Sequence, residues 1–296
     1  MRPRHGSLSV VTALLLAQAL AACGASHRAA PNVDPAQVAP ASAAKSVVSP
    51  PSSSAVVPPE VHTSSALTVP PEIQALLNSP DRLPEDRLLD EGRKPAKLLA
   101  FFGVKPGMMV AELGAGGGYT SEFLARAVGP TGKVYGQNTK FILDRFAEKP
   151  WSERLKRPVA QNIVRVDREF EDPFPPEAKK LDLVLINLFY HDLYWMKVDR
   201  DKMNKAAFAA LKPGGIYGIV DHAAKDGAGA KDVETLHRIE QSELVGDVEK
   251  QGFKLEKQGD FLRNPADTKD WSTSPKSAAE KRGTSDRFVL LFRKPS

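Results

Sequence analysis

The sequence predicts an α/β domain with a doubly wound, mostly parallel sheet and one antiparallel strand near the edge of that sheet. Short apolar runs alternate with helix-like patterns through the middle of the chain, as they do in βαβ units. The run over residues 181–186 is almost unbroken, which is typical of a parallel strand buried on both faces. Two closely spaced strand patterns, residues 254–261 and 287–292, end the chain and favour an antiparallel strand near the edge.

Two short helices are predicted before the first strand. One begins near Pro84 and stops before Gly92, and the other has Pro95 in its first turn and Gly103 as its stop. The remaining elements alternate: strands over residues 108–113, 133–137, 163–166, 181–186 and 216–220, and helices over residues 120–128, 199–211 and 231–251.

A glycine turn joins the first predicted strand to the helix that follows it. Its glycines stand at alternate positions: Gly114, Gly116 and Gly118. Glycine lets the backbone turn tightly and approach a ligand closely, and the helix directs its N-terminal amides at that ligand. Glu112 stands two residues before the first glycine. A carboxylate at this position suits the cationic end of a ligand, whereas it would repel a pyrophosphate.

This turn resembles the first motif of class I S-adenosylmethionine-dependent methyltransferases. More narrowly, the chain is similar to a group of bacterial predicted methyltransferases that carry export signals, from about Arg93 to the C-terminus. The other shared segments are Arg93-Lys94-Pro95, Tyr190-His191-Asp192, Leu211-Lys212-Pro213-Gly214-Gly215, Asp221-His222 and Leu236-His237-Arg238. The resemblance implies a seven-stranded Rossmann-like methyltransferase sheet and S-adenosylmethionine as the cofactor. It implies no particular acceptor.

The same resemblance implies where the cofactor is contacted. In the superfamily an acidic residue near position 138 usually accepts hydrogen bonds from both ribose hydroxyls; here Asn138 can accept through one oxygen only. In the superfamily, adenine is commonly contacted just after the third strand. Arg93 and Lys94 are predicted either to be solvated or to contact the methionine carboxylate of the cofactor or a substrate. The predicted cofactor-binding residues are Glu112, Gly114, Gly116, Gly118, Asn138, Asp167, Arg168 and Asn187.

The predicted catalytic residues follow two strands that are neighbours in the superfamily's strand order. They are His191, Asp192, Asp221 and His222. Open α/β sheets bind ligands at the carboxyl ends of their strands, where these side chains could converge. A histidine with a carboxylate partner suits a general base near neutral pH. Two alternatives stay open: the histidines serve only to satisfy loop backbone groups, or the His and Asp side chains bind a metal, although no spacing signature indicates one and no metal ligand is predicted.

His237 and Glu240 are predicted on the apolar side of the helix over residues 231–251. A histidine in that position is interpreted as a core residue and not as a ligand.

The N-terminus is typical of an exported protein. Arg2 and Arg4 precede an apolar run over residues 8–22, which is too short to span a bilayer comfortably. The run ends Leu20-Ala21-Ala22-Cys23, which looks like the lipobox of bacterial lipoproteins. Residues 1–22 are therefore predicted to be a lipoprotein signal peptide and Cys23, the only cysteine, to be lipidated. Gly24 in place of Asp favours the periplasmic face of the outer membrane.

Residues 23–70 are rich in Ala, Pro and Ser and are predicted to be a disordered tether to a domain over residues 71–296. The net charge is +5, and the charges of both signs are interspersed, which argues against a nucleic-acid partner. The predicted function is methyl transfer from S-adenosylmethionine to a small-molecule acceptor by a membrane-anchored enzyme. The alternatives are a non-catalytic methyltransferase-like domain that binds a periplasmic ligand, and an enzyme with a different cofactor. The oligomeric state is not predicted.

Overall fold

The structure is a computed structural model, and it describes residues 62–63 and 67–296, which belong to one compact unit. The predicted signal peptide, Cys23 and most of the predicted tether lie outside the described residues. Within the described part of the chain, no helix is both long enough and apolar enough to cross a membrane.

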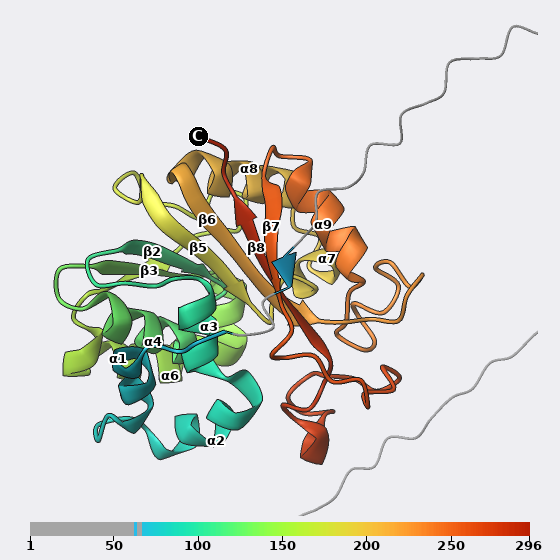
Figure 1. Cartoon of the computed structure of the whole chain (residues 1–296), viewed down its shortest axis with the longest axis horizontal. Helices are drawn as coiled ribbons and strands as arrows, with labels where there is room; N and C mark the ends of the chain where they lie inside the picture. The colour runs from blue at the N-terminus through green and yellow to red at the C-terminus, as the bar shows by residue number, and fades with distance from the viewer. Residues whose placement is uncertain (1–61, 64–66) are drawn as a thin grey trace, which may run out of the picture. The chain divides into compact units, whose positions relative to one another are not determined.

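An eight-stranded sheet forms the centre of the fold (Figure 1). From one edge to the other its strands are β1 (His62–Thr63), β7 (Lys254–Gly259), β8 (Arg287–Arg293), β6 (Leu211–His222), β5 (Leu181–Asn187), β2 (Met109–Leu113), β3 (Lys133–Asn138) and β4 (Ile163–Asp167). Only β8 runs antiparallel to its neighbours, β6 and β7. The seven strands from β2 to β8 therefore confirm the predicted doubly wound, mostly parallel sheet with an antiparallel strand near its edge.

The eighth strand was not expected. His62–Thr63 falls within the predicted tether and pairs in parallel with β7, so the sheet begins before residue 71. Strands pair through their backbone groups, and a strand of two residues is too short to carry an alternating hydrophobic pattern that the sequence could show.

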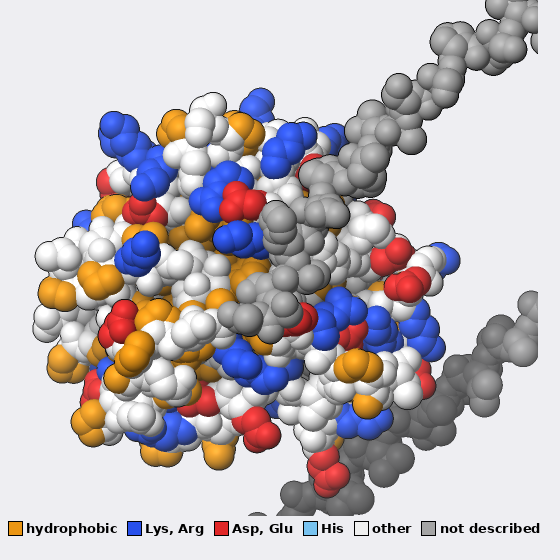
Figure 2. Space-filling view, viewed as in Figure 1, with side chains coloured by type: hydrophobic (Ala, Val, Ile, Leu, Met, Phe, Trp, Pro, Cys, Tyr) orange, Lys and Arg blue, Asp and Glu red, His pale blue; other side chains and the backbone are white. Residues whose placement is uncertain are grey.

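Helices cover both faces of the sheet, as Figure 1 shows, with α1 to α4 and α6 on one side and α8 and α9 on the other. Their bounds are α1 (Pro71–Ala75), α2 (Pro84–Arg93), α3 (Pro95–Phe101), α4 (Tyr119–Val128), α5 (Lys140–Ile142), α6 (Glu148–Leu155), α7 (Asp192–Trp195), α8 (Arg200–Ala210) and α9 (Gln241–Glu249). On the face seen in Figure 2, Lys and Arg side chains are interspersed with Asp and Glu side chains.

Two large aromatic side chains, Trp151 in α6 and Phe102 directly after α3, pack against glycines of the sheet on the face that α1 to α4 and α6 cover. A Cβ atom at Gly136 would lie 2.7 Å from the ring of Trp151, and one at Gly218 would lie 2.7 Å from the ring of Phe102. These contacts bring α6 down onto β3 and α3 onto β6. The Trp151 ring also lies where a Cβ of Gly118 would stand, so α6 packs on the glycine turn as well.

The predicted long helix over residues 231–251 is wrong in its first half. Only Gln241–Glu249 is helical, and residues 223–240 form a loop. Arg238 is fully buried, pairs with Asp267 at 2.8 Å and donates to the carbonyl of Ala223 at 3.0 Å. Ile239 forms a β-bridge with Ala223. These long-range contacts hold the backbone extended beside the end of β6, and they outweigh the helical periodicity.

Candidate active site

The glycine turn between β2 and α4 has the backbone that its sequence predicts. Gly114, Gly116 and Gly118 all have positive φ, of 69°, 56° and 81°. A Cβ at Gly118 would lie 2.3 Å from the ring of Trp151, whereas one at Gly116 would meet nothing within 4 Å. Gly116 is therefore the point of the turn where the backbone borders open space.

Side chains at the end of β3 brace this turn. The Gly116 amide donates to Asn138 Oδ1 at 2.8 Å, and Asn138 Nδ2 donates back to the Gly116 carbonyl at 3.1 Å. Gln137, which the sequence analysis did not single out, accepts from the Gly114 amide at 3.0 Å and donates to the carbonyl of Arg168 at 2.6 Å. Both functional groups of Asn138 are thus used on the turn itself, and its contact with a ribose stays a prediction.

Glu112 is buried at the end of β2, where it accepts a hydrogen bond from the hydroxyl of Ser121. Burial raises the pKa of Glu112 to about 7, against the lowering effect of that hydrogen bond and of nearby positive charges. The carboxyl group consequently changes its charge close to neutral pH.

Arg93 lies at the end of α2, with its guanidinium 4.7 Å from the centre of the Tyr119 ring. Burial lowers the pKa of Arg93, and among the described residues no carboxylate lies within ion-pair distance of it. Tyr119 is itself held by a 2.8 Å hydrogen bond to Asp90. Lys94, the residue after Arg93, donates a hydrogen bond to the carbonyl of Phe261 at 2.7 Å.

The remaining predicted cofactor residues stand at the carboxyl ends of β4 and β5. Asp167 is exposed and pairs with Arg165 at 2.8 Å. Arg168 donates its amide to the carbonyl of Asn138 at 3.2 Å and directs its side chain to Asp172. Asn187 donates to the hydroxyl of Thr120 in α4 at 3.0 Å.

The two predicted catalytic pairs lie together. His191 Nδ1 lies 2.6 Å from Asp221 Oδ1, and the amide of His191 donates to Asp221 Oδ2 at 2.7 Å. On its other side, His191 Nε2 lies 3.3 Å from Asp192 Oδ1. The rings of His191 and His222 have centroids 5.6 Å apart. Adjacent strands β5 and β6 end side by side, which explains the convergence.

The charge state of His191 does not suit a general base. Burial alone would lower its pKa, but the negative charges of Asp221 and Asp192 outweigh burial and raise the pKa to about 10. His191 therefore carries a proton on both ring nitrogens at neutral pH, and a base must be free to accept one. His222 differs, because removal from water and the nearby charges of His191 and Arg287 hold its pKa well below the usual value. Its Nδ1 lies 2.7 Å from the hydroxyl of Ser285.

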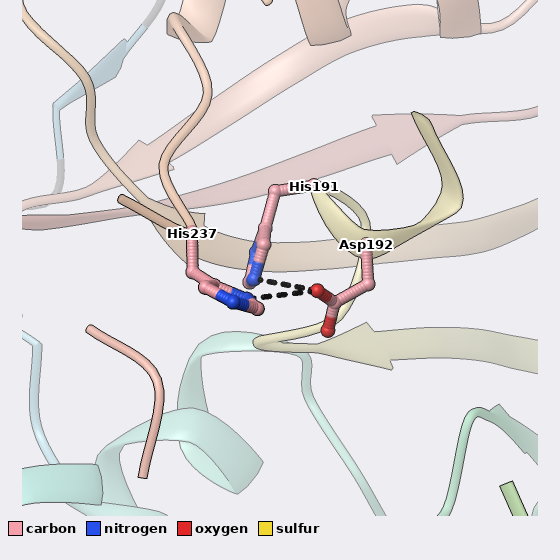
Figure 3. Close-up of side chains that lie close together, drawn as sticks. All are labelled: His191, Asp192 and His237. Carbon is pink, nitrogen blue, oxygen red and sulfur yellow. Dashed lines mark hydrogen bonds and ion pairs between the residues drawn. The ribbon is translucent and has the colours of Figure 1, made fainter. Parts of the chain in front are cut away.

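A third histidine belongs to this cluster and was missed by the sequence analysis, which took it for a core residue of a helix. His237 lies on the loop before α9, with Nδ1 3.0 Å from Asp192 Oδ1 and its ring centroid 5.4 Å from that of His191 (Figure 3). Glu240, predicted beside it, instead precedes α9 and accepts from the Gly229 amide at 2.7 Å. The available signal was the shared segment Leu236-His237-Arg238.

The His/Asp cluster (His191, Asp192, Asp221, His222 and His237) lies at the same end of the sheet as the glycine turn. The loop that leads from β5 to His191 carries Phe189, whose ring lies 3.0 Å from where a Cβ would stand on Gly114. An aromatic group adjoins the other side: Trp195 donates to Asp192 Oδ1 at 2.6 Å, and its ring centroid lies 6.2 Å from that of the partly exposed Phe141. The His/Asp cluster and the glycine turn between β2 and α4 thus lie at the same end of the sheet.

Solved structures with a similar fold include proteins described as S-adenosylmethionine-dependent or putative methyltransferases, and no family model matches the chain. A protein of Galdieria sulphuraria, provisionally named a sarcosine dimethylglycine methyltransferase, is 20% identical with a TM-score of 0.50, over 71% of this chain and 88% of its own. A methyltransferase of Aquifex aeolicus is 20% identical with a TM-score of 0.49, over 75% of this chain and 96% of its own. The [4+2]-cyclase SpnF is 13% identical with a TM-score of 0.50, over 69% of this chain and 80% of its own. The described domain has the class I methyltransferase fold.

Proposed function

We propose that this protein transfers a methyl group from S-adenosylmethionine to a small-molecule acceptor. One observation carries the proposal: the open backbone at Gly116 and the His/Asp cluster lie at the same end of the sheet, where Phe189 from the loop before His191 packs on Gly114. A methyltransferase needs these two features side by side, one for the cofactor and one for the acceptor.

The side chains around the turn fit this cofactor. Gly116 leaves room for a ligand against the backbone, and the guanidinium of Arg93, which has no carboxylate partner in the described part of the chain, offers a partner for the methionine carboxylate. Glu112 offers negative charge toward the cationic part of the molecule when its carboxyl is ionised. When bound, S-adenosylmethionine supplies an activated methyl group on a sulfonium. Asn138, Asp167, Arg168 and Asn187 are proposed to bound the ribose and adenine side of the same site.

On the acceptor side, His222 is the best candidate for the base. It is neutral at physiological pH, and its ring Nε2 has no hydrogen-bond partner among the described residues. Nε2 can accept a proton in the tautomer in which Nδ1 donates to the hydroxyl of Ser285. His191, fixed between Asp221 and Asp192, lies beside the acceptor and does not remove a proton. The aromatic rings of Trp195 and Phe141 provide an apolar wall for the rest of a small acceptor.

A non-catalytic or differently reacting domain is the second candidate, since a [4+2]-cyclase shares this fold. Calorimetric titration of the full chain with S-adenosylmethionine and with S-adenosylhomocysteine separates these cases. Binding of both, followed by release of S-adenosylhomocysteine when candidate acceptors are added, supports the methyltransferase. If neither ligand binds, the proposal fails; if both bind but no acceptor from a broad panel turns over, the binding domain is favoured.

We also propose that the protein is exported and anchored to the periplasmic face of the outer membrane by lipid on Cys23. The support is the sequence alone: the basic start, the apolar run and the Leu20-Ala21-Ala22-Cys23 segment. Labelling with a fatty acid should mark the wild type and leave Cys23→Ala unmarked. Equal labelling of the two would refute the anchor.

A further inference from the structure

Three side chains of the His/Asp cluster converge as metal ligands do. His191, Asp192 and His237 each offer one ligating atom, and these atoms all lie within 4.8 Å of one another. Figure 3 shows both imidazoles turned toward the same Asp192 carboxylate, from the loop before α7 and from the loop before α9. The segments are 45 residues apart in sequence, so only the tertiary fold brings them together.

The residues behind these ligands hold them in the orientation that metal sites require. Asp221 accepts from His191 Nδ1 at 2.6 Å, which leaves Nε2 directed into the cluster. A histidine ligand is oriented in this way by a carboxylate on its other nitrogen in many metal sites. Trp195 fixes Asp192 through Oδ1 at 2.6 Å, and among the described residues Oδ2 has no hydrogen-bond partner.

The backbone supports a specific placement of both histidines. His237 has φ of 51°, and Leu188, three residues before His191, has φ of 59°. Residues other than glycine rarely adopt such a left-handed backbone conformation, which costs about 1–3 kcal/mol when the surroundings impose it. Residues with this conformation concentrate at functional sites. Thr273 holds the carbonyl of His237 with a 2.7 Å hydrogen bond, so the loop conformation is fixed by tertiary contacts.

We propose that His191 Nε2, His237 Nδ1 and the carboxylate of Asp192 bind one divalent transition-metal ion, of the zinc or ferrous iron class. Two imidazoles with one carboxylate suit these ions better than Mg²⁺ or Ca²⁺, which prefer oxygen ligands. The ion displaces the proton that His191 Nε2 carries in the metal-free protein, because a ligating imidazole nitrogen must be deprotonated. Three protein ligands leave at least one coordination position open. If the proposed function holds, an oxygen of the acceptor occupies that position, and the ion places it beside the glycine turn. The metal site itself does not depend on methyl transfer.

Solvent reaches the site from one side, as ion entry requires. The side chain of His237 is 26% exposed and that of Asp192 is 15% exposed, whereas His191 is nearly buried at 3%. His237 is therefore the ligand whose removal should least disturb the fold. His222 provides a matched control, because it touches the His191 ring but directs Nδ1 to Ser285, away from Asp192.

The test is titration of the chelator-treated full chain with Co²⁺, followed by visible absorption and by calorimetry, with Zn²⁺ competition. We expect one ion per chain, visible absorption of a low-symmetry Co²⁺ complex, and affinity reduced about 100-fold or more in His237→Gln and in Asp192→Asn. His222→Gln should bind as the wild type does, and circular dichroism should show all variants folded. Absence of stoichiometric binding by the wild type, or unchanged affinity in both folded ligand variants, would overturn the site. S-adenosylmethionine binding, measured separately, distinguishes this failure from failure of the proposed function.

Discussion

Asp221 fixes His191 by two separate hydrogen bonds, one from the His191 amide at 2.7 Å and one from its Nδ1 at 2.6 Å. The amide of His222 also donates to the same carboxylate, at 2.8 Å. One fully buried side chain at the end of β6 thus sets the position of the loop that follows β5. The bond network couples the ends of two strands to the orientation of an imidazole.

Replacing Asp221 with Asn should therefore destabilise the protein strongly. An amide has one acceptor oxygen for three donors and leaves the His191 cation without its buried counter-charge, which costs about 3–5 kcal/mol. Urea unfolding measures the loss. Asp172→Asn is the control, because its pairing with Arg168 is largely exposed and should contribute less than about 1 kcal/mol. Equal, small effects in the two variants would show that Asp221 does not organise the cluster.

Much of this site follows from local sequence. The strands were predicted from apolar runs, and the proximity of His191 to Asp221 followed from the expectation that the strands before them are neighbours. The glycine turn was predicted from the spacing of its three glycines, because glycine readily adopts backbone conformations that other residues avoid. All three glycines have such a conformation in the structure. These features depend on residues close together in the chain, or on a regular sheet order.

The parts that could not be predicted depend on distant contacts. His237 lies in a helix-like pattern, but Arg238 next to it is drawn into a buried pair with Asp267, twenty-nine residues later. The double hydrogen bond of Asn138 to Gly116 likewise depends on the exact register of β3 against β2. No sequence period records either contact, so tertiary structure overrides the local signal.

Gly116→Ala should weaken binding of S-adenosylmethionine at least about tenfold without unfolding the protein. The added methyl group would project into the open space beside the turn, where the ligand is proposed to lie. A left-handed alanine also costs about 1–2 kcal/mol of backbone strain. Gly103→Ala is the matched control, because Gly103 has φ of 63° and equally open surroundings at the end of α3. Calorimetry should show weaker binding only in the first variant; parallel losses would mean that strain alone is responsible.

Asn138→Asp discriminates between two roles for that residue. If Asn138 braces the turn, a carboxylate loses the donor to the Gly116 carbonyl and places negative charge against it in a buried position. We then expect a loss of about 1–3 kcal/mol in unfolding free energy and weaker cofactor binding. If the ribose contact implied by the family resemblance dominates, the carboxylate should bind the cofactor at least as tightly. Unfolding and calorimetric titration of the same variant decide between them.

Glu112 should make the folded state less stable as pH rises through neutrality. Its folded pKa of about 7 lies above the ordinary value of 4.5, so the native state binds more protons than the unfolded state between these values. The free energy of unfolding should consequently fall by about 3 kcal/mol from pH 4.5 to pH 7.5. A difference of one bound proton between the native and unfolded states changes this free energy by about 1.4 kcal/mol per pH unit. Glu112→Gln removes this contribution and should flatten the profile over that window. Superimposable wild-type and variant profiles would place the carboxyl in a more polar environment.

Arg93→Gln should weaken binding of S-adenosylhomocysteine and spare binding of methylthioadenosine, which lacks the amino-acid carboxylate. The Arg93 guanidinium is packed on Tyr119 with no carboxylate partner among the described residues, so a ligand carboxylate would complete its interactions. A charge-assisted hydrogen bond in such a site is worth about 1.5–3 kcal/mol, or about 10- to 150-fold in Kd. Lys97→Gln, on the exposed face of α3, should leave both affinities unchanged. A variant that loses both ligands equally would show that Arg93 supports the shape of the pocket, and one that loses neither would remove Arg93 from the cofactor site.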